Sequence, residues 1–228
     1  MSDTLLTELA DNGVLTITLN RPEVLNSLNE TITLGLLQAL IDARTNKDVR
    51  AIVITGAGRA FCAGADLDSK SWPSPKGLSA GEATAASMDR GFNPLVKAVS
   101  QSTKPVVTAI NGIAAGGGVG LALAGDIAIA SESAKFKLVF GPNLGIIPDM
   151  GASWFLPNLI GRARLRRLAR RGRRLLHLLP VLVRAGEELD VVAVEPFEPR
   201  QHVARECGVR VPDVRQAIHV IDRCGHIK

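Results

Sequence analysis

The stretch KPVVTAINGIAAGGG, residues 104–118, decides the fold class of this chain. Within it, Val106–Ile110 is an unbroken run of β-favouring residues, typical of a strand buried on both faces of a parallel sheet. Asn111 and Gly112 end the run, and the glycines at 116–118 then lead into an apolar helix. Glycines at a helix N-terminus expose backbone N–H groups that favour negative charge, although tight packing of the helix on the strand would also require them.

The sequence on either side alternates strands and helices in the same way. Val14–Leu19 alternates apolar and polar residues and predicts a strand, whereas apolar residues at helical spacing follow Asn29, a predicted N-cap. Further strands are predicted at Ala51–Thr55, Ile127–Ala130 and Phe136–Phe140, a helix at Met88–Ser100 interrupted at Pro94, and a surface loop at Ser69–Ala80. This order predicts an α/β domain.

Charge divides the chain into two parts. Residues 1–161 contain 12 basic and 14 acidic side chains, whereas residues 162–228 contain 15 basic and 8 acidic ones. We therefore predict a domain over residues 1–164 and an atypical Arg-rich region over residues 165–228. That region is either a divergent basic surface or, because its only lysine is Lys228, the product of a shifted reading frame in a GC-rich gene.

Several kinds of site and location are disfavoured by the sequence. Three widely spaced cysteines without a CxxC pattern argue against a disulfide framework and a zinc site. No apolar run reaches the roughly 18 residues of a membrane span, and the N-terminus does not resemble a signal peptide, so we expect a cytoplasmic protein without a membrane partner. No histidine precedes His177, which leaves the first part without a Ser-His-Asp triad. Asp66 and Asp68 are predicted to be solvated or capping rather than metal-binding, and Cys62 to be a small buried hydrophobic residue.

Four segments together resemble the crotonase family, the enoyl-CoA hydratase/isomerase enzymes. They are RPEVLNSL (21–28), GAGRAFCAGADL (56–67), KPVVTAINGIAAGGG (104–118) and LGIIPDMG (144–151), and the resemblance covers about residues 13–165. It implies a ClpP/crotonase-like spiral of ββα units that binds an acyl-CoA substrate and assembles as a homotrimer or dimer of trimers, if the Arg-rich region permits. Coenzyme A is then part of the substrate, and neither a separate cofactor nor a metal is implied.

The resemblance also implies which residues bind the thioester. Two backbone N–H groups, those of Ala65 and Gly117, would hold the thioester oxygen. The implied CoA-thioester-binding residues are Leu25, Ala63, Ala65, Asp66, Leu67, Asp68 and Gly117. The chemistry fits, because removing a proton next to a thioester places negative charge on its oxygen, and two fixed donors stabilise that charge.

The acidic residues indicate which reaction is possible. Crotonase hydratases use two glutamates, but the corresponding positions here are Gly120 and Phe140–Gly141, where no acid stands. One acid, Asp149, follows Ile-Ile-Pro, and its surroundings resemble the family branch that contains ring 1,2-epoxyphenylacetyl-CoA isomerases. The resemblance implies that Asp149 is the catalytic acid/base. The alternative is a structural role in which Asp149 caps the segment Met150–Leu156.

These observations predict an acyl-CoA thioester isomerase with Ala65, Gly117 and Asp149 as catalytic groups. Two alternatives stay open: an enoyl-CoA hydratase (a lyase) of fatty-acid or aromatic-acid degradation, such as phenylacetate degradation, and a catalytically inactive crotonase-like protein. Nucleic-acid binding through the Arg-rich region is disfavoured, because that region offers only Phe197 as an aromatic residue and no groove-reading motif.

Overall fold

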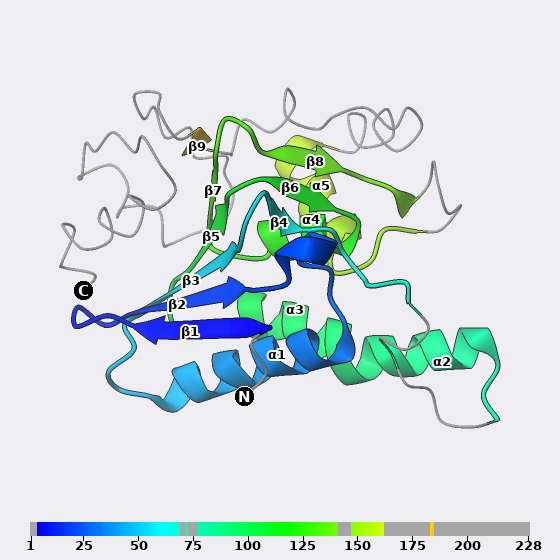
Figure 1. Ribbon diagram of the computed structural model, residues 1–228, viewed down its shortest axis with the longest axis horizontal. Helices are drawn as coiled ribbons and strands as arrows, with labels where there is room; N and C mark the ends of the chain where they lie inside the picture. The colour runs from blue at the N-terminus through cyan, green and yellow to red at the C-terminus, as the bar shows by residue number, and fades with distance from the viewer. Residues whose placement is uncertain (1–3, 69–71, 73–76, 141–146, 162–182, 185–228) are drawn as a thin grey trace.

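The described part of the chain forms two β-sheets, and successive turns of the chain add a strand to each of them (Figure 1). The computed structural model describes residues 4–68, 72, 77–140, 147–161 and 183–184. The larger sheet has the order β1-β2-β3-β5-β7-β9 and the smaller one the order β4-β6-β8. Only the β1/β2 hairpin is antiparallel among the described pairings.

The bounds of the elements show how the sheets are built. The larger sheet comprises β1 (Leu5–Leu9), β2 (Val14–Leu19), β3 (Ala51–Gly56), β5 (Val106–Ile110), β7 (Ile127–Ala130) and β9 (Val183–Arg184). The smaller sheet comprises β4 (Ala60–Cys62), β6 (Ile113–Ala115) and β8 (Lys135–Lys137). The helices are η1 (Pro22–Val24), α1 (Glu30–Thr45), α2 (Ala80–Ser87), η2 (Met88–Phe92), α3 (Asn93–Ser100), α4 (Gly117–Leu123) and α5 (Ala152–Ile160).

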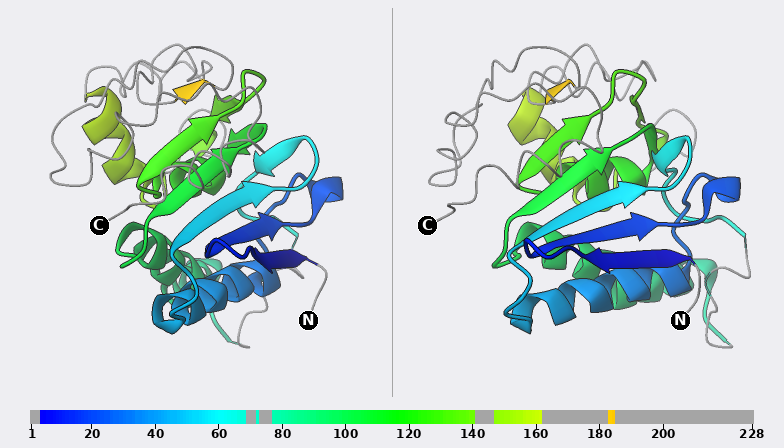
Figure 2. Two further views of the ribbon diagram at one scale, coloured as in Figure 1. Left: turned by 90° about the vertical axis from the view of Figure 1, so that its left-hand side faces the viewer. Right: turned by 60° about the vertical axis from the view of Figure 1, so that its left-hand side comes forward.

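The order of these elements confirms the predicted spiral. β3, β5 and β7 each enter the larger sheet and are followed within a few residues by β4, β6 and β8 of the smaller sheet. Helices connect one turn of the spiral to the next, as parallel strands require. Figure 2 shows α1 lying along one face of the larger sheet.

The core explains why the sequence forms these elements. All five residues of β5 are buried, as its unbroken apolar run predicts. Asn29 caps α1, since its side chain accepts a hydrogen bond of 2.9 Å from the Ile32 N–H. Behind this cap, Ile32, Leu36 and Leu40 of α1 point into the core.

Three details differ from what the sequence predicts. The strand expected at Phe136–Phe140 is β8, which ends at Lys137, and the short strands β4 and β6 were not predicted because three residues show no periodicity. The irregularity expected at Pro94 lies just before it, in the π-helical segment η2, which ends at Phe92 and continues directly into α3. Most of the expected loop at Ser69–Ala80 lies outside the described residues, and Ala80 begins α2.

The first turns of α4 approach β4 so closely that a side chain has no room. A Cβ built on Gly118 would overlap the Cys62 carbonyl oxygen and lie 3.0 Å from the Cys62 Cβ. Backbone atoms of Cys62 cannot swing away as a flexible side chain could, so the helix can lie this close to the strand only with glycine at position 118.

We therefore expect Gly118→Ala to destabilise the fold by about 1–3 kcal/mol through overpacking. The matched control is Gly81→Ala in α2, where an added Cβ meets nothing within 4 Å. That change should be neutral or stabilise by up to about 1 kcal/mol, because alanine favours helix more than glycine does. Chemical denaturation of both variants measures the difference; equal stabilities would contradict the packing assigned to Gly118.

Candidate active site

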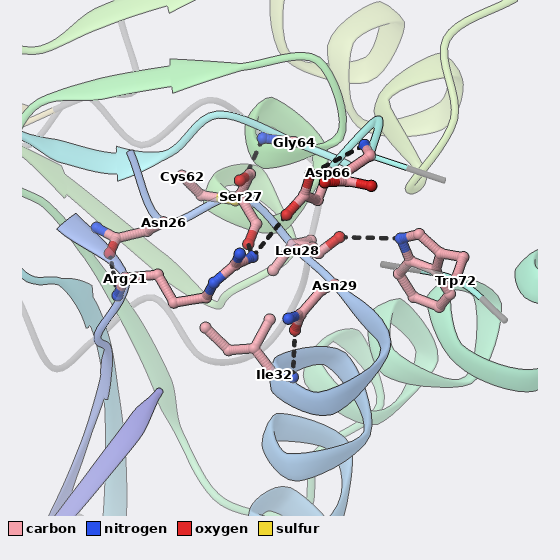
Figure 3. A network of polar contacts seen from close by, with 11 residues as sticks. Arg21, Asn26, Ser27, Leu28, Asn29, Ile32, Cys62, Gly64, Asp66 and Trp72 are labelled. Carbon is pink, nitrogen blue, oxygen red and sulfur yellow. Dashed lines mark hydrogen bonds and ion pairs between the residues drawn. The ribbon is translucent and has the colours of Figure 1, made fainter. Parts of the chain in front are cut away.

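The loop that follows β4 lies beside the segment before α1 (Figure 3), and backbone hydrogen bonds hold the two together. The Ala63 N–H donates to the Leu25 carbonyl at 3.0 Å, and the Leu28 N–H donates to the Gly64 carbonyl at 2.7 Å. The Asp66 N–H in turn donates to the Leu28 carbonyl at 2.9 Å. The structure thus brings together two segments that the sequence predicts to bind the thioester.

Ala65 is the residue of this loop whose N–H faces away from Leu28. Leu28 and Ala65 form an isolated parallel bridge, made by the N–H of Leu28 and the N–H of Asp66. In such a bridge the polar groups of the opposing residue point to the other side. The Ala65 N–H is therefore directed away from the 25–28 segment and is available to a ligand on that side.

The N-terminus of α4 lies directly beside this loop. A Cβ on Gly64 would stand 2.9 Å from the Gly117 nitrogen and 2.8 Å from the Ala115 carbonyl oxygen. Gly64 has a φ of +92°, so only glycine fits this turn without strain. The two predicted donors, at Ala65 and Gly117, consequently belong to chain segments in van der Waals contact.

Gly117 is buried and occupies the first position of α4. The N–H groups of a first helical turn have no partner within the helix, and the helix dipole makes them attractive to negative charge. The preceding residue is engaged elsewhere, because the Gly116 N–H donates to the Lys137 carbonyl at 3.0 Å. The site therefore presents a backbone donor at Gly117 in surroundings with little water.

Asp149 places a carboxylate next to Gly117. A Cβ on Gly117 would stand 3.3 Å from the Asp149 Oδ1 atom. This oxygen is buried and has no hydrogen-bond partner among the described residues. Burial raises the pKa of Asp149 from 3.8 to about 6, although a hydrogen bond from its own backbone N–H opposes the rise.

The structure does not give Asp149 the capping role considered as the alternative. The N-cap of α5 is Gly151, which has no side-chain cap hydrogen bond. Asp149 contributes only its main-chain carbonyl, which accepts from the Ala152 N–H at 2.9 Å. Its carboxylate therefore does not cap α5.

The turn that carries Asp149 packs tightly on α4. Met150 has a φ of +50°, a conformation that is uncommon for a residue with a side chain. A Cβ on Gly120 would overlap the Met150 carbonyl oxygen, and one on Gly117 would stand 2.8 Å from the Met150 Cγ. No side chain, and hence no glutamate, can occupy position 120 unless the backbone of Met150 moves.

Asp66 and Leu67, which were also predicted to bind the thioester, differ in their surroundings. Asp66 forms an ion pair of 2.9 Å with Arg21, and its second oxygen accepts from the Asp68 N–H at 3.1 Å. Leu67 is 83% exposed. Among the residues that the structure describes, no three His, Cys, Asp or Glu side chains gather in a group that could hold a metal ion.

Cys62 has the surroundings that the sequence predicts, whereas two polar residues near the site were not predicted. Cys62 is fully buried, as expected, and burial raises the pKa of its thiol to about 12. The polar side chains of Arg21 and Asn26 were not predicted as parts of the site. Both belong to the segment RPEVLNSL, which also contains Leu25, a residue expected to bind the thioester, and this proximity in the sequence could have identified them.

Comparisons with known proteins show which proteins this chain resembles. The sequence pattern of the family described as enoyl-CoA hydratase/isomerase matches residues 10–177. The chain is 46% identical over 165 residues to 1,2-epoxyphenylacetyl-CoA isomerase of Escherichia coli (strain K12), covering 72% of this chain and 62% of that protein. YngF of Bacillus subtilis, whose name includes enoyl-CoA hydratase/isomerase, is 37% identical to this chain over 232 residues. The match covers 100% of this chain and 79% of YngF.

A solved structure shows the same fold. The enoyl-CoA hydratase of Bacillus anthracis superimposes with a TM-score of 0.66 at 38% identity, covering 75% of this chain and 64% of that one. The chain therefore spans less than two thirds of the length of this structure and of the Escherichia coli relative. In the part of the chain that the structure describes, no helix is long and apolar enough to cross a membrane.

The partly buried carboxylate of Asp149 predicts an unusual dependence of stability on pH. Because the folded-state pKa of Asp149 is raised to about 6, the ionised carboxylate is disfavoured in the fold. This penalty is present above about pH 6 and disappears below the unfolded pKa near 4, where both states are protonated. Asp149→Asn removes the charge, so its melting temperature should exceed that of the wild type at pH 8, with the difference shrinking towards pH 4. A variant less stable than the wild type at pH 8 would indicate that the carboxylate is structural.

Proposed function

This chain belongs to the enoyl-CoA hydratase/isomerase family, and we propose that it isomerises an acyl-CoA thioester by moving a proton between two carbon atoms. The observation that carries the proposal is the buried, unpartnered oxygen of Asp149 beside the first residue of α4. Coenzyme A arrives as part of the substrate, so the step needs no separate cofactor.

In the proposed step the Asp149 carboxylate removes a proton from the carbon next to the thioester carbonyl. The electron pair of the broken C–H bond moves into the thioester, and negative charge develops on its oxygen. The N–H groups of Ala65 and Gly117 donate to this oxygen, and such a donor typically contributes about 3–4 kcal/mol. The protonated Asp149 then returns the proton to a different carbon, which shifts the double bond and regenerates the carboxylate.

The raised pKa of Asp149 suits this role. A general base is most effective when its pKa lies near the working pH, and a value of about 6 brings the carboxylate closer to that range than the usual 3.8. The Asp149 carboxylate is ionised above about pH 6, so the isomerisation rate should rise with pH up to that point and then level off.

The packing of Gly120 favours isomerisation over hydration. Hydration by the two-glutamate route needs a carboxylate at position 120, and the Met150 carbonyl occupies that space. Hydratase remains the second candidate because the similar Bacillus anthracis structure carries that name. The name of the Escherichia coli relative makes a ring epoxide of phenylacetyl-CoA the first substrate to test, with phenylacetate degradation as the proposed context.

Assembly enters the proposal through the family, and location through the sequence. We propose a homotrimer or dimer of trimers, if the Arg-rich region permits, as the family resemblance implies, and a cytoplasmic location, as the sequence predicts. The boundary at residue 164 and the reading-frame hypothesis stay predictions, since residues 165–228 lie almost wholly outside the described residues.

The direct experiment replaces the proposed base. Asp149→Asn should lower the isomerisation rate of 3-enoyl-CoA or ring-epoxide substrates by about a hundredfold to ten-thousandfold, the range for a lost general base. Exchange of the substrate α-proton with deuterated solvent should fall in parallel, whereas KM should change little. The control is Glu132→Gln, an exposed carboxylate on the loop after β7 that should leave the rate unchanged. A wild-type rate in Asp149→Asn would refute the assignment, and a wild type inactive on every thioester would favour a catalytically inactive protein.

A substitution pair at position 65 tests the oxyanion donor. Ala65→Pro deletes the N–H, which makes no hydrogen bond in the bridge to Leu28, and we expect turnover to fall about a hundredfold or more. Ala65→Ser adds a similar bulk but keeps the N–H and should retain most activity. Equal losses in the two variants, with equal melting temperatures, would show that the side chain rather than the N–H matters at this position.

A further inference from the structure

Arg21 makes two contacts through a single nitrogen atom. Its Nη1 donates to the Ser27 carbonyl at 2.8 Å and to the Asp66 Oδ2 at 2.9 Å (Figure 3). The side chains of Arg21 and Asp66 are only 15% and 14% exposed. An ion pair this far from water contributes little net stability, because desolvation offsets most of the attraction. Its more evident effect is geometric, since it joins two segments that are 45 residues apart in the sequence.

The position of Arg21 is itself fixed by the fold. The Arg21 N–H donates to the Asn26 Oδ1 at 2.9 Å, and the Asn26 side chain is wholly buried. The Asn26 amide donates to the carbonyls of Ala57 and Ala60 at 2.9 and 2.8 Å, which anchors it to the turn between β3 and β4. Arg21 therefore extends from a rigid base, and its guanidinium is a fixed point for the loop that contains Asp66.

Ala65 lies between two anchored residues of that loop. On one side the Gly64 carbonyl accepts from the Leu28 N–H, and on the other side the Asp66 N–H donates to the Leu28 carbonyl. These two bonds fix the distance of the loop from Leu28 on both sides of Ala65. The contact between Asp66 and Arg21 adds a third attachment, made by a side chain, immediately after Ala65.

We propose that Arg21 is a positioning residue that, through its ion pair with Asp66, aims the Ala65 N–H at the thioester oxygen. The inference rests on the proposed function, because it assumes that the Ala65 N–H binds that oxygen. Arg21 acts through Asp66 in this account and is assigned no contact with the substrate. A shift of about 1 Å in a donor is enough to reduce turnover by about a hundredfold, so a positioning contact can be as important as the donor.

The test uses the carbonyl stretching frequency of a bound thioester as its readout. An enoyl-CoA labelled with ¹³C at the thioester carbonyl is bound to the full-length protein, and difference infrared spectroscopy reports how strongly the N–H groups polarise that bond. Arg21→Met keeps the length of the side chain and removes its charge and donors. We expect Arg21→Met to lose at least half of the frequency shift and to lower kcat by about tenfold to a hundredfold, with KM within about threefold of the wild type.

A matched control separates positioning from loss of any ion pair. Arg90 and Glu30 form the second described ion pair, at 2.6 Å, and the Arg90 side chain is 46% exposed. Arg90→Met should leave both the frequency shift and kcat unchanged. If Arg21→Met does not fold, Asp66→Asn tests the same contact. Asparagine keeps the size of the side chain and an acceptor oxygen but loses the charge. We expect Asp66→Asn to lose part of the frequency shift.

The outcomes distinguish this inference from the proposed function. A full frequency shift in a folded Arg21→Met or Asp66→Asn protein would overturn the role of Arg21 and leave the proposed function intact. A wild-type protein that binds the labelled thioester without any shift would overturn both, because no oxyanion donor would then be acting. A reduced shift in Arg21→Met and an unchanged shift in Arg90→Met would support the inference.

Discussion

The close approach of backbone to backbone around the first turns of α4 is the constraint on which the site depends. An added Cβ at Gly118 would overlap the Cys62 carbonyl, and one at Gly120 would overlap the Met150 carbonyl. Helix α4 is therefore in contact with the loop after β4 on one side and with the turn that carries Asp149 on the other. Side chains at these positions would separate the donors from the carboxylate and allow water between them.

This packing also accounts for the chemistry available to the site. Partial exclusion of water raises the pKa of Asp149 to about 6, and its buried Oδ1 has no partner among the described residues. The fold thus bears a cost in stability that a solvated carboxylate would not impose. The same exclusion strengthens the hydrogen bonds that Ala65 and Gly117 would give to a charged thioester oxygen. In our account, the low stability of the ionised carboxylate and its reactivity have one cause.

The sequence predicted the fold better than the surroundings of the candidate site residues. The unbroken run of β5 and the cap at Asn29 follow from local patterns, and both are confirmed. The strands β4 and β6 could not be predicted in this way, because three residues carry no periodicity. The ion pair of Arg21 with Asp66 and the overlap at Gly120 depend on segments distant in sequence, which no local pattern contains.

The central claim is that one buried carboxylate and two backbone donors move a proton between carbons without adding water. The most direct measurement is product analysis by mass spectrometry after incubating the wild-type protein with crotonyl-CoA and 3-enoyl-CoA in water enriched in ¹⁸O. Our account predicts that 3-enoyl-CoA is converted into its 2-enoyl isomer without ¹⁸O, and that crotonyl-CoA gains no oxygen at a comparable rate. Rapid formation of an ¹⁸O-labelled 3-hydroxyacyl-CoA would contradict it and would identify the protein as a hydratase.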